Sequence, residues 1–190
     1  MTRLARLPLL LLAFLVATTD AAAAQEEATV VILVRHAEKV TVDPNDRDPA
    51  LTAAGETRAR ALAQALEGAG VDAVITTQFQ RTRNTAKPVA DALGITPAVI
   101  ASGPNLLAQI AEAVRTRHAG QTVLVVGHSN SVPGTIEALG GPKVAEICES
   151  QYANLFVMVL RAGEAPTLVR SRYGAADPAP GPECAGMMAQ

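Results

Sequence analysis

The sequence predicts an α/β protein with three layers, α/β/α, in which helices cover both faces of a mainly parallel central sheet. Runs of β-branched and aliphatic residues alternate along the chain with longer Ala-rich amphipathic stretches. Strands that alternate with helices form parallel sheets. The 190 residues are 49% hydrophobic but only 3% aromatic, with no Trp, so small aliphatic side chains must fill one closely packed core.

The first elements are predicted from local signals. Residues 29–34 are mostly β-branched, which suits a central strand that is buried on both faces. Residues 40–50 are rich in Asp and Pro and indicate a loop. Thr52 can cap a helix that follows the loop and runs to about residue 67, where Gly68 and Gly70 end it.

The rest of the chain continues this alternation. Pro88 should break or kink the second helix, and the last two strands are close enough in sequence to form a hairpin. The expected elements are a strand at 71–76, a helix at 79–93, a strand at 95–100, a helix at 105–118, a strand at 122–127, a helix with Pro133 in its first turn that ends near Gly140, and strands at 155–160 and 167–173, before an irregular tail from residue 175.

The first 24 residues have the pattern of a secretory signal peptide. Arg3 and Arg6 precede an apolar run at residues 9–16, and small residues offer a cleavage site near Ala24. The apolar run is well short of the ~20 residues that a membrane-spanning helix needs, so an uncleaved anchor is the weaker alternative. We therefore expect a periplasmic or secreted protein with no stable membrane insertion after cleavage.

The two cysteines, Cys148 and Cys184, both lie in the predicted mature part. An even pair in an oxidising compartment favours a disulfide, which would attach the Pro-rich tail to the domain. Two unpaired thiols are the alternative. A metal site is not expected, because two cysteines without histidines at ligand spacing do not complete a tetrahedral shell.

Cationic and imidazole side chains follow three of the predicted strands. Arg35 and His36 follow the first strand, and Arg81 and Arg83 come after the second. His128 follows a later strand. Because ligands of such sheets bind outside the carboxyl ends of the strands, we expect two of the chain's three histidines to meet at one edge.

These residue types suit the transfer of a phosphoryl group. The planar fork of an arginine matches phosphoryl oxygens, and a neutral imidazole can attack phosphorus to form a phosphohistidine that water then hydrolyses. A second imidazole and the backbone amides after His128 can hold the same oxygens. An isolated Arg-His pair is usually part of a solvated loop, so the prediction depends on the whole set.

Four stretches agree, in order and spacing, with the motifs of one known family. They are VILVRHAE at 31–38, like its Arg-His-Gly or Arg-His-Ala signature; LTAAG at 51–55, like the start of its LTxxGxxQA helix, with Arg58 where glutamine is usual; TQFQRTRNTA at 77–86, like SPLxRAxQTA; and VVGHSN at 125–130, like the VSHGG strand end. Over roughly residues 30–160 the chain therefore resembles the histidine phosphatase superfamily, branch 1, which includes the phosphoglycerate mutases.

The resemblance implies a role for each matching residue. His36 would be the phosphorylated nucleophile, Arg35 and Arg81 would bind the phosphoryl oxygens, and His128 would complete the pocket. It also implies a phosphoglycerate mutase-like fold for a catalytic domain at residues 25–174, which the signal peptide precedes and the tail follows.

The acid that protonates the leaving group is missing from its usual place. The commonest family members have a Glu after the third strand, whereas residues 95–107 contain no carboxylate. Glu38, two residues after the nucleophile, is one candidate, and Asp43, Asp46 and Asp48 in the following loop are others. Each is more simply explained as a solvated, substrate-facing or structural carboxylate.

The function that the sequence supports best is an exported phosphomonoesterase that acts through a phosphohistidine on His36. Small members without the usual Glu include phosphohistidine phosphatases and exported sugar-phosphate or lipopolysaccharide-core phosphatases. A mutase-type phosphotransferase is the less favoured enzyme, because this short chain has few loops to enclose a doubly phosphorylated intermediate. A module that binds a phosphate ligand without turnover is the alternative from another class.

A small phosphorylated substrate is the expected partner, and no cofactor or metal is implied. The net charge of −2 offers no general attraction to nucleic acid. A cluster of arginines and histidines would repel a metal ion, and no carboxylate cluster compensates near it. The sequence does not indicate the oligomeric state or the identity of the substrate.

Overall fold

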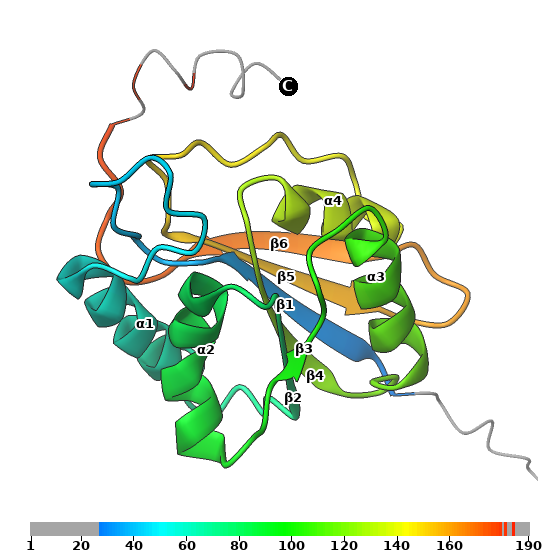
Figure 1. The fold of residues 1–190 in the computed structure, drawn as a ribbon. Coiled ribbons are helices and arrows are strands. Elements are labelled where there is room, and N and C mark those ends of the chain that lie inside the picture. Colours follow the sequence, from blue (N-terminus) through cyan, green and yellow to red (C-terminus); the bar gives the residue numbers. More distant parts are fainter. Residues whose placement is uncertain (1–26, 180, 182–183, 185–190) are drawn as a thin grey trace, which may run out of the picture.

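The structure is a computed structural model that describes residues 27–179, 181 and 184 (Figure 1). The predicted signal peptide lies outside these residues. Of the helices in the described ranges, none is long and apolar enough to cross a membrane. The elements are β1 (Thr29–Arg35), α1 (Ala53–Ala65), β2 (Ala73–Thr76), α2 (Gln80–Leu93), β3 (Ala98–Val99), α3 (Leu106–Thr116), β4 (Thr122–Gly127), α4 (Ser131–Ala138), β5 (Asn154–Leu160) and β6 (Thr167–Arg172).

The central sheet has the strand order β3-β2-β4-β1-β5-β6 and is mixed. Strands β1 to β4 are mutually parallel, whereas β5 runs antiparallel to β1 and β6 antiparallel to β5. The parallel prediction is therefore confirmed for the strands that alternate with helices, and the hairpin prediction for the last two. Arg35 at the end of β1 is paired with Gly127, and Val34 with Leu155 near the start of β5. The ends of β1 and β4 and the start of β5 thus share one edge.

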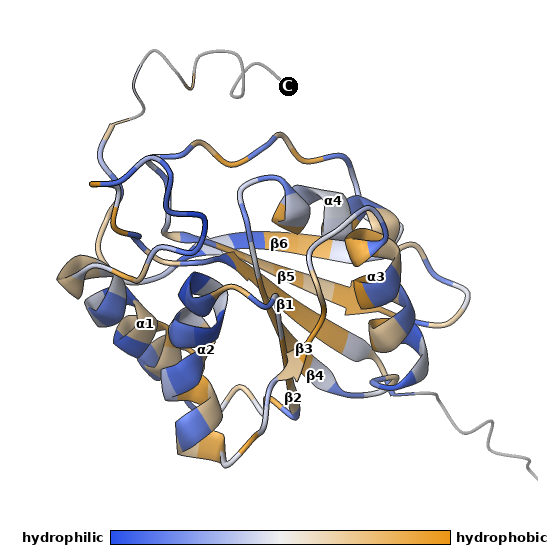
Figure 2. Cartoon of the chain, in the orientation of Figure 1, coloured by the Kyte–Doolittle hydropathy of each residue, from blue (hydrophilic) through white to orange (hydrophobic). Residues whose placement is uncertain are grey.

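Two apolar layers separate the sheet from its helices. Helices α1 and α2 cover one face and α3 and α4 the other (Figure 1). Side chains of β1 alternate between the layers, with Val31 and Leu33 packed on the α3 and α4 side and Ile32 and Val34 on the α1 and α2 side. Figure 2 shows the apolar strands at the centre and hydrophilic residues on the outer helix surfaces. This is the three-layer α/β/α architecture that the sequence predicts.

Helix α1 begins where the sequence predicts. Thr52 has extended backbone, and its Oγ1 accepts a hydrogen bond from the backbone N–H of Gly55 at 3.1 Å. Such a bond satisfies one of the donors that a helix leaves free at its N-terminus. A Cβ atom at Gly55 would overlap the carbonyl oxygen of Glu38, so glycine lets the start of α1 pack against the segment after β1.

Two predicted elements are wrong in detail. Of the two alternatives predicted at Pro88, a break or a kink, the break is wrong: helix α2 continues through Pro88, because its buried inner face packs on the core and offsets the hydrogen bond that proline cannot donate. Strand β3 has only the residues Ala98–Val99 instead of residues 95–100. Its first part is lost because Pro97 has no N–H for a sheet, while the N–H of Ile95 bonds back to the end of α2.

A disulfide and an aspartate attach the tail to the segment before β5. Cys148 and Cys184 are bonded, with their Cα atoms 5.4 Å apart, so the predicted disulfide is confirmed. Asp177 accepts hydrogen bonds from the backbone N–H groups of Tyr152 and Ala153 at 2.8 and 3.0 Å. Both attachments hold a segment that lies at the carboxyl edge of β1.

Candidate active site

Two histidines meet at the edge of the sheet, directly after β1 and β4. The backbone N–H of His36 donates to the carbonyl oxygen of Gly127 at 2.9 Å, so the parallel pairing continues one residue past β1. The rings of His36 and His128 are edge to face, with their centroids 5.4 Å apart. The structure therefore brings together the two histidines that the sequence places at strand ends.

His36 is buried, with 3% of its surface exposed, and one backbone contact sets which of its ring nitrogens carries the proton. Its Nδ1 lies 2.8 Å from the carbonyl oxygen of Ala37. Because a carbonyl can only accept, Nδ1 carries the proton and Nε2 the lone pair. Thr85 of α2 fixes this peptide by accepting the N–H of Ala37 at 2.9 Å. Burial lowers the pKa of His36 to about 3, and the charge of Arg35 adds to this effect.

His128 is held by the turn into α4. Its backbone N–H donates to Ser131 Oγ at 2.9 Å, and a Cβ atom at Gly127 would lie 2.8 Å from the same oxygen, so glycine permits the turn. Its Nε2 lies 3.1 Å from Thr77 Oγ1. Burial lowers the pKa of His128 to about 4, with the charge of Arg81 as the next cause. An anion bound beside the ring would favour its protonated form.

Arg81 reaches the site from the first turn of α2. Its guanidinium lies over the ring of Phe79, with 4.2 Å between Cζ and the ring centroid. Nη1 donates to the carbonyl oxygen of Arg47 at 3.3 Å and is 3.7 Å from a carboxylate oxygen of Asp48. Burial lowers the pKa of Arg81 from its usual value, and the charge of Asp48 opposes that shift. These contacts hold the guanidinium, and Arg81 lines the same pocket as His36 and His128.

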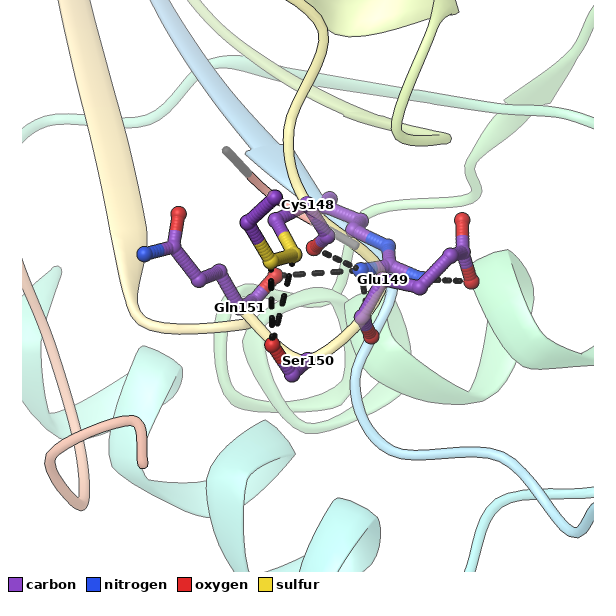
Figure 3. The surroundings of a disulfide bond; sticks show 6 residues. Cys148, Glu149, Ser150 and Gln151 are labelled. Atoms are coloured by element: carbon purple, nitrogen blue, oxygen red, sulfur yellow. Dashed lines mark hydrogen bonds and ion pairs between the residues drawn. A yellow bond between two sulfur atoms is a disulfide. The ribbon is translucent and has the colours of Figure 1, made fainter. Parts of the chain in front are cut away.

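Arg35 is 1% exposed and is bound by the segment before β5. Its Nη1 donates to the carbonyl oxygens of Cys148, Glu149 and Gln151 at 2.8, 3.0 and 3.1 Å. Its Nη2 lies 2.6 Å from Glu149 Oε2, and its guanidinium stacks 4.4 Å from the centroid of the Tyr152 ring. Figure 3 shows this segment beside the disulfide. Arg35 is thus enclosed by this segment at the back of the site, where its Nε–H has no hydrogen-bond partner among the described residues.

The pocket in front of these groups has a volume of about 230 Å³. Arg35 and Arg81 each keep a buried Nε–H that has no hydrogen-bond partner among the described residues. An unpaired buried donor costs free energy, which an anionic ligand could relieve. The pocket is lined by His36, Lys39, Phe79, Arg81, Ser102, His128, Ser129, Asn130 and Glu149.

This arrangement can perform nucleophilic chemistry on an anionic group. The Nε2 lone pair of His36 is available, and its neutral state does not depend on a separate base. The cations around it attract phosphoryl oxygens, which carry negative charge throughout transfer. Within the described ranges, no group of three or more His, Cys, Asp or Glu side chains is arranged to hold a metal ion.

The carboxylates that the sequence offers as leaving-group acids have other partners. Glu38 forms a bidentate ion pair with Arg58, with N···O distances of 2.8 to 3.0 Å. Asp43 and Asp46 each accept a backbone N–H two residues further along the loop. Asp48 accepts the first backbone N–H of α2 at 2.8 Å. Their contacts are those of structural carboxylates.

Four residues that the sequence did not single out lie at the site: Lys39, Thr77, Glu149 and Tyr152. Lys39 adds a cation to the pocket wall, and Glu149 is the one carboxylate among the described residues that line it. The signal for Glu149 and Tyr152 is the antiparallel pairing of β5 with β1, which places the start of β5 at the catalytic edge. Sequence periodicity does not reveal this pairing.

Solved structures of similar fold include several phosphatases. A structure from Nakamurella multipartitia assigned as a phosphohistidine phosphatase SixA has a TM-score of 0.55 at 24% identity and covers 80% of this chain and 99% of that one. The protein histidine phosphatase SixA in complex with tungstate has a TM-score of 0.60 at 19% identity, over 75% and 96% of the two chains. A mycobacterial glucosyl-3-phosphoglycerate phosphatase with inorganic phosphate has a TM-score of 0.58 at 15% identity, over 77% and 97%.

The sheet topology, with two histidines and two arginines gathered at one edge, defines the phosphoglycerate mutase-like class of α/β proteins. Residues 31–103 match the family model of the histidine phosphatase superfamily (branch 1), which supports the resemblance of the sequence motifs to this superfamily. A probable phosphoglycerate mutase, GpmB, of Yersinia enterocolitica is 41% identical over 69 residues, which are 34% of this chain. The match spans about a third, 32%, of that protein's length.

Proposed function

We propose that the protein is an exported phosphomonoesterase that hydrolyses a small phosphate ester through a phosphohistidine on His36. The state of His36 carries this proposal. Its proton is held at Nδ1 by a carbonyl oxygen, its Nε2 keeps a lone pair, and its pKa of about 3 keeps the ring neutral at physiological pH. His128 and Arg81 line the same pocket.

In this proposal the reaction has two displacements at phosphorus. Arg35, Arg81 and His128 bind the phosphoryl oxygens, and Nε2 of His36 attacks as the bond to the leaving oxygen breaks. Water then attacks the phosphohistidine, and the P–N bond breaks to restore the neutral imidazole. The hydrogen bond from Nδ1 to Ala37 keeps the ring oriented in both steps.

Hydrolysis is favoured over a mutase reaction because this short chain has few loops to enclose a doubly phosphorylated intermediate. The SixA proteins and the glucosyl-3-phosphoglycerate phosphatase among the similar structures are phosphatases by name. The GpmB resemblance keeps a phosphotransferase as the alternative enzyme.

The export part of the proposal has two supports. The basic start, apolar run and small residues before residue 25 have the pattern of a signal peptide. The bond between Cys148 and Cys184 suits an oxidising compartment. Fractionation of cells that express the full chain tests it: a shortened protein in the exported fraction supports export, and a full-length protein in the cytosol contradicts it.

Turnover by matched histidine variants tests the catalytic proposal. We expect the mature protein to release inorganic phosphate from p-nitrophenyl phosphate, and His36→Asn to lower the rate at least about a thousandfold, because the nucleophile is lost. His118→Asn is the control, since His118 contacts the Gln121 side chain at the opposite edge of the sheet, before β4. Equal turnover by both variants would contradict the proposal, and phosphate binding without turnover by the wild type would indicate a binding module.

A further inference from the structure

The proposed reaction lacks an assigned proton donor for the leaving group. The carboxylates near His36 in sequence either form an ion pair with Arg58 or accept hydrogen bonds from backbone N–H groups of the loop and of the start of α2. An alcohol leaves slowly as an alkoxide, so the cleft that holds His36 should also present an acid.

Glu149 is placed where such an acid is needed. It lines the pocket together with His36 and His128, and 61% of its side-chain surface is exposed. Its charge acts on the pKa values of both Arg81 and His128, which places it within electrostatic reach of these two residues. Only its Oε2 contacts Arg35, so the carboxyl group is tethered to the site without being enclosed.

The backbone beside Glu149 is held rigidly enough to aim a side chain. Arg35 binds three carbonyl oxygens of this short segment, and the disulfide of Cys148 attaches it to Cys184 (Figure 3). A group held by such contacts loses little further freedom when it acts, which is the advantage of preorganisation in a site.

We propose that Glu149 is the general acid and base of the reaction, supplied by the segment before β5; this inference rests on the proposed function. In the first step Nε2 of His36 forms a bond to phosphorus, the bond to the ester oxygen breaks, and that oxygen takes the proton of the Glu149 carboxyl group. In the second step water bonds to phosphorus and gives a proton to the Glu149 carboxylate as the P–N bond breaks. Alcohol and inorganic phosphate leave, and both residues regain their starting states.

Substrate binding prepares Glu149 for the first step. A phosphate dianion competes with the Glu149 carboxylate for the guanidinium of Arg35, because both carry negative charge. The displaced carboxylate takes a proton from bulk water, and this is the proton that the ester oxygen receives in the first step.

Leaving-group dependence separates an acid from a residue that only positions Arg35. Phenyl phosphate and p-nitrophenyl phosphate have similar shapes, but phenolate is the more basic leaving group and needs the proton more. We expect Glu149→Gln to lower kcat/KM about 100-fold for phenyl phosphate and by no more than about threefold for p-nitrophenyl phosphate. Glu149→Asp should recover part of the phenyl phosphate activity.

Glu164→Gln is the matched control. Glu164 is 63% exposed and faces an arginine, Arg161, in the loop between β5 and β6, at the opposite edge of the sheet from the pocket. We expect it to leave both kcat/KM values unchanged. Each variant is checked by thermal melting, so that a loss through unfolding is recognised.

The outcomes separate this inference from the function on which it rests. An equal loss for both esters in Glu149→Gln would mean that Glu149 positions Arg35 and would overturn the assignment as acid, while the phosphatase proposal would stand. An unchanged kcat/KM for both esters in Glu149→Gln would also overturn the assignment of Glu149 as acid. No turnover of either ester by the wild-type protein would overturn the proposed function and the role of Glu149 with it.

Discussion

Replacing Arg58 with Gln, the usual family residue at this place, should destabilise the fold by about 3 kcal/mol. Arg58 is 4% exposed on α1, and its guanidinium joins three segments. It holds Glu38 after β1 through a bidentate ion pair, and it donates to the carbonyl oxygens of Tyr173 and Ala175 at 3.2 and 2.9 Å. The carboxylate of Asp177 lies 3.7 Å away.

The magnitude follows from what the shorter side chain leaves unpaired. Removing one partner of a buried ion pair costs about 3–5 kcal/mol, because the remaining charge is buried without compensation. Glu38 is 24% exposed, so water reaches its carboxylate in the variant and the lower end of the range applies. For a chain of this size, about 3 kcal/mol corresponds to a decrease in Tm of roughly 6–12 °C.

Equilibrium urea denaturation followed by circular dichroism measures this change. Lys87→Gln is the control, because the ion pair of Lys87 with Asp91 on α2 is exposed and should contribute less than about 0.5 kcal/mol. A loss below about 1 kcal/mol in Arg58→Gln would contradict this prediction, since the pair would then behave like a surface pair. Arg58 does not line the pocket, so turnover by the folded variant should stay near the wild-type value.

Three further predictions concern the site and its support. In 15N NMR, His36 and His128 should remain neutral at pH 5, because their pKa values are about 3 and 4, and titration of either ring near pH 6.5 would contradict this. Because the unfolded chain protonates histidine near pH 6.5, the free energy of unfolding should fall as the pH decreases below that value. Replacing Cys148 and Cys184 with Ser should cost about 4 kcal/mol for a loop of 36 residues, and an unchanged urea midpoint would show that the bond does not constrain the chain. Gly127→Ala should cost about 1–3 kcal/mol and lower turnover, because its Cβ atom would crowd the turn that holds His128, and full activity would argue against that placement.

Local signals predict the elements whose causes are local. The β-branched run at residues 29–34 forms β1, and the side-chain oxygen of Thr52 caps the N-terminus of α1. Strand β3 is shorter than predicted because Pro97 limits its pairing. A prediction from the apolar pattern alone does not take account of the missing N–H of proline. Helix α2 passes through Pro88 because burial of its inner face outweighs one missing hydrogen bond.

In the candidate site too, local signals predict some residues and miss others. The strand-end rule finds His36 and His128, because parallel strands bring their carboxyl ends to one edge. Glu149 escapes that rule because it precedes an antiparallel strand, and the partner of a strand is a long-range property. The contacts of Arg35 with the backbone before β5 depend on the same pairing and could not be read from the motif around it.

Trapping the phosphorylated enzyme shows directly whether His36 is the nucleophile. The wild-type protein is mixed with p-nitrophenyl phosphate, quenched in alkali within milliseconds, digested and mapped by mass spectrometry. We expect a phosphoryl group on His36 that is stable in alkali and lost in acid, and no such group on His128 or in His36→Asn. Phosphate release without any labelled intermediate, or a label on another residue, would contradict it.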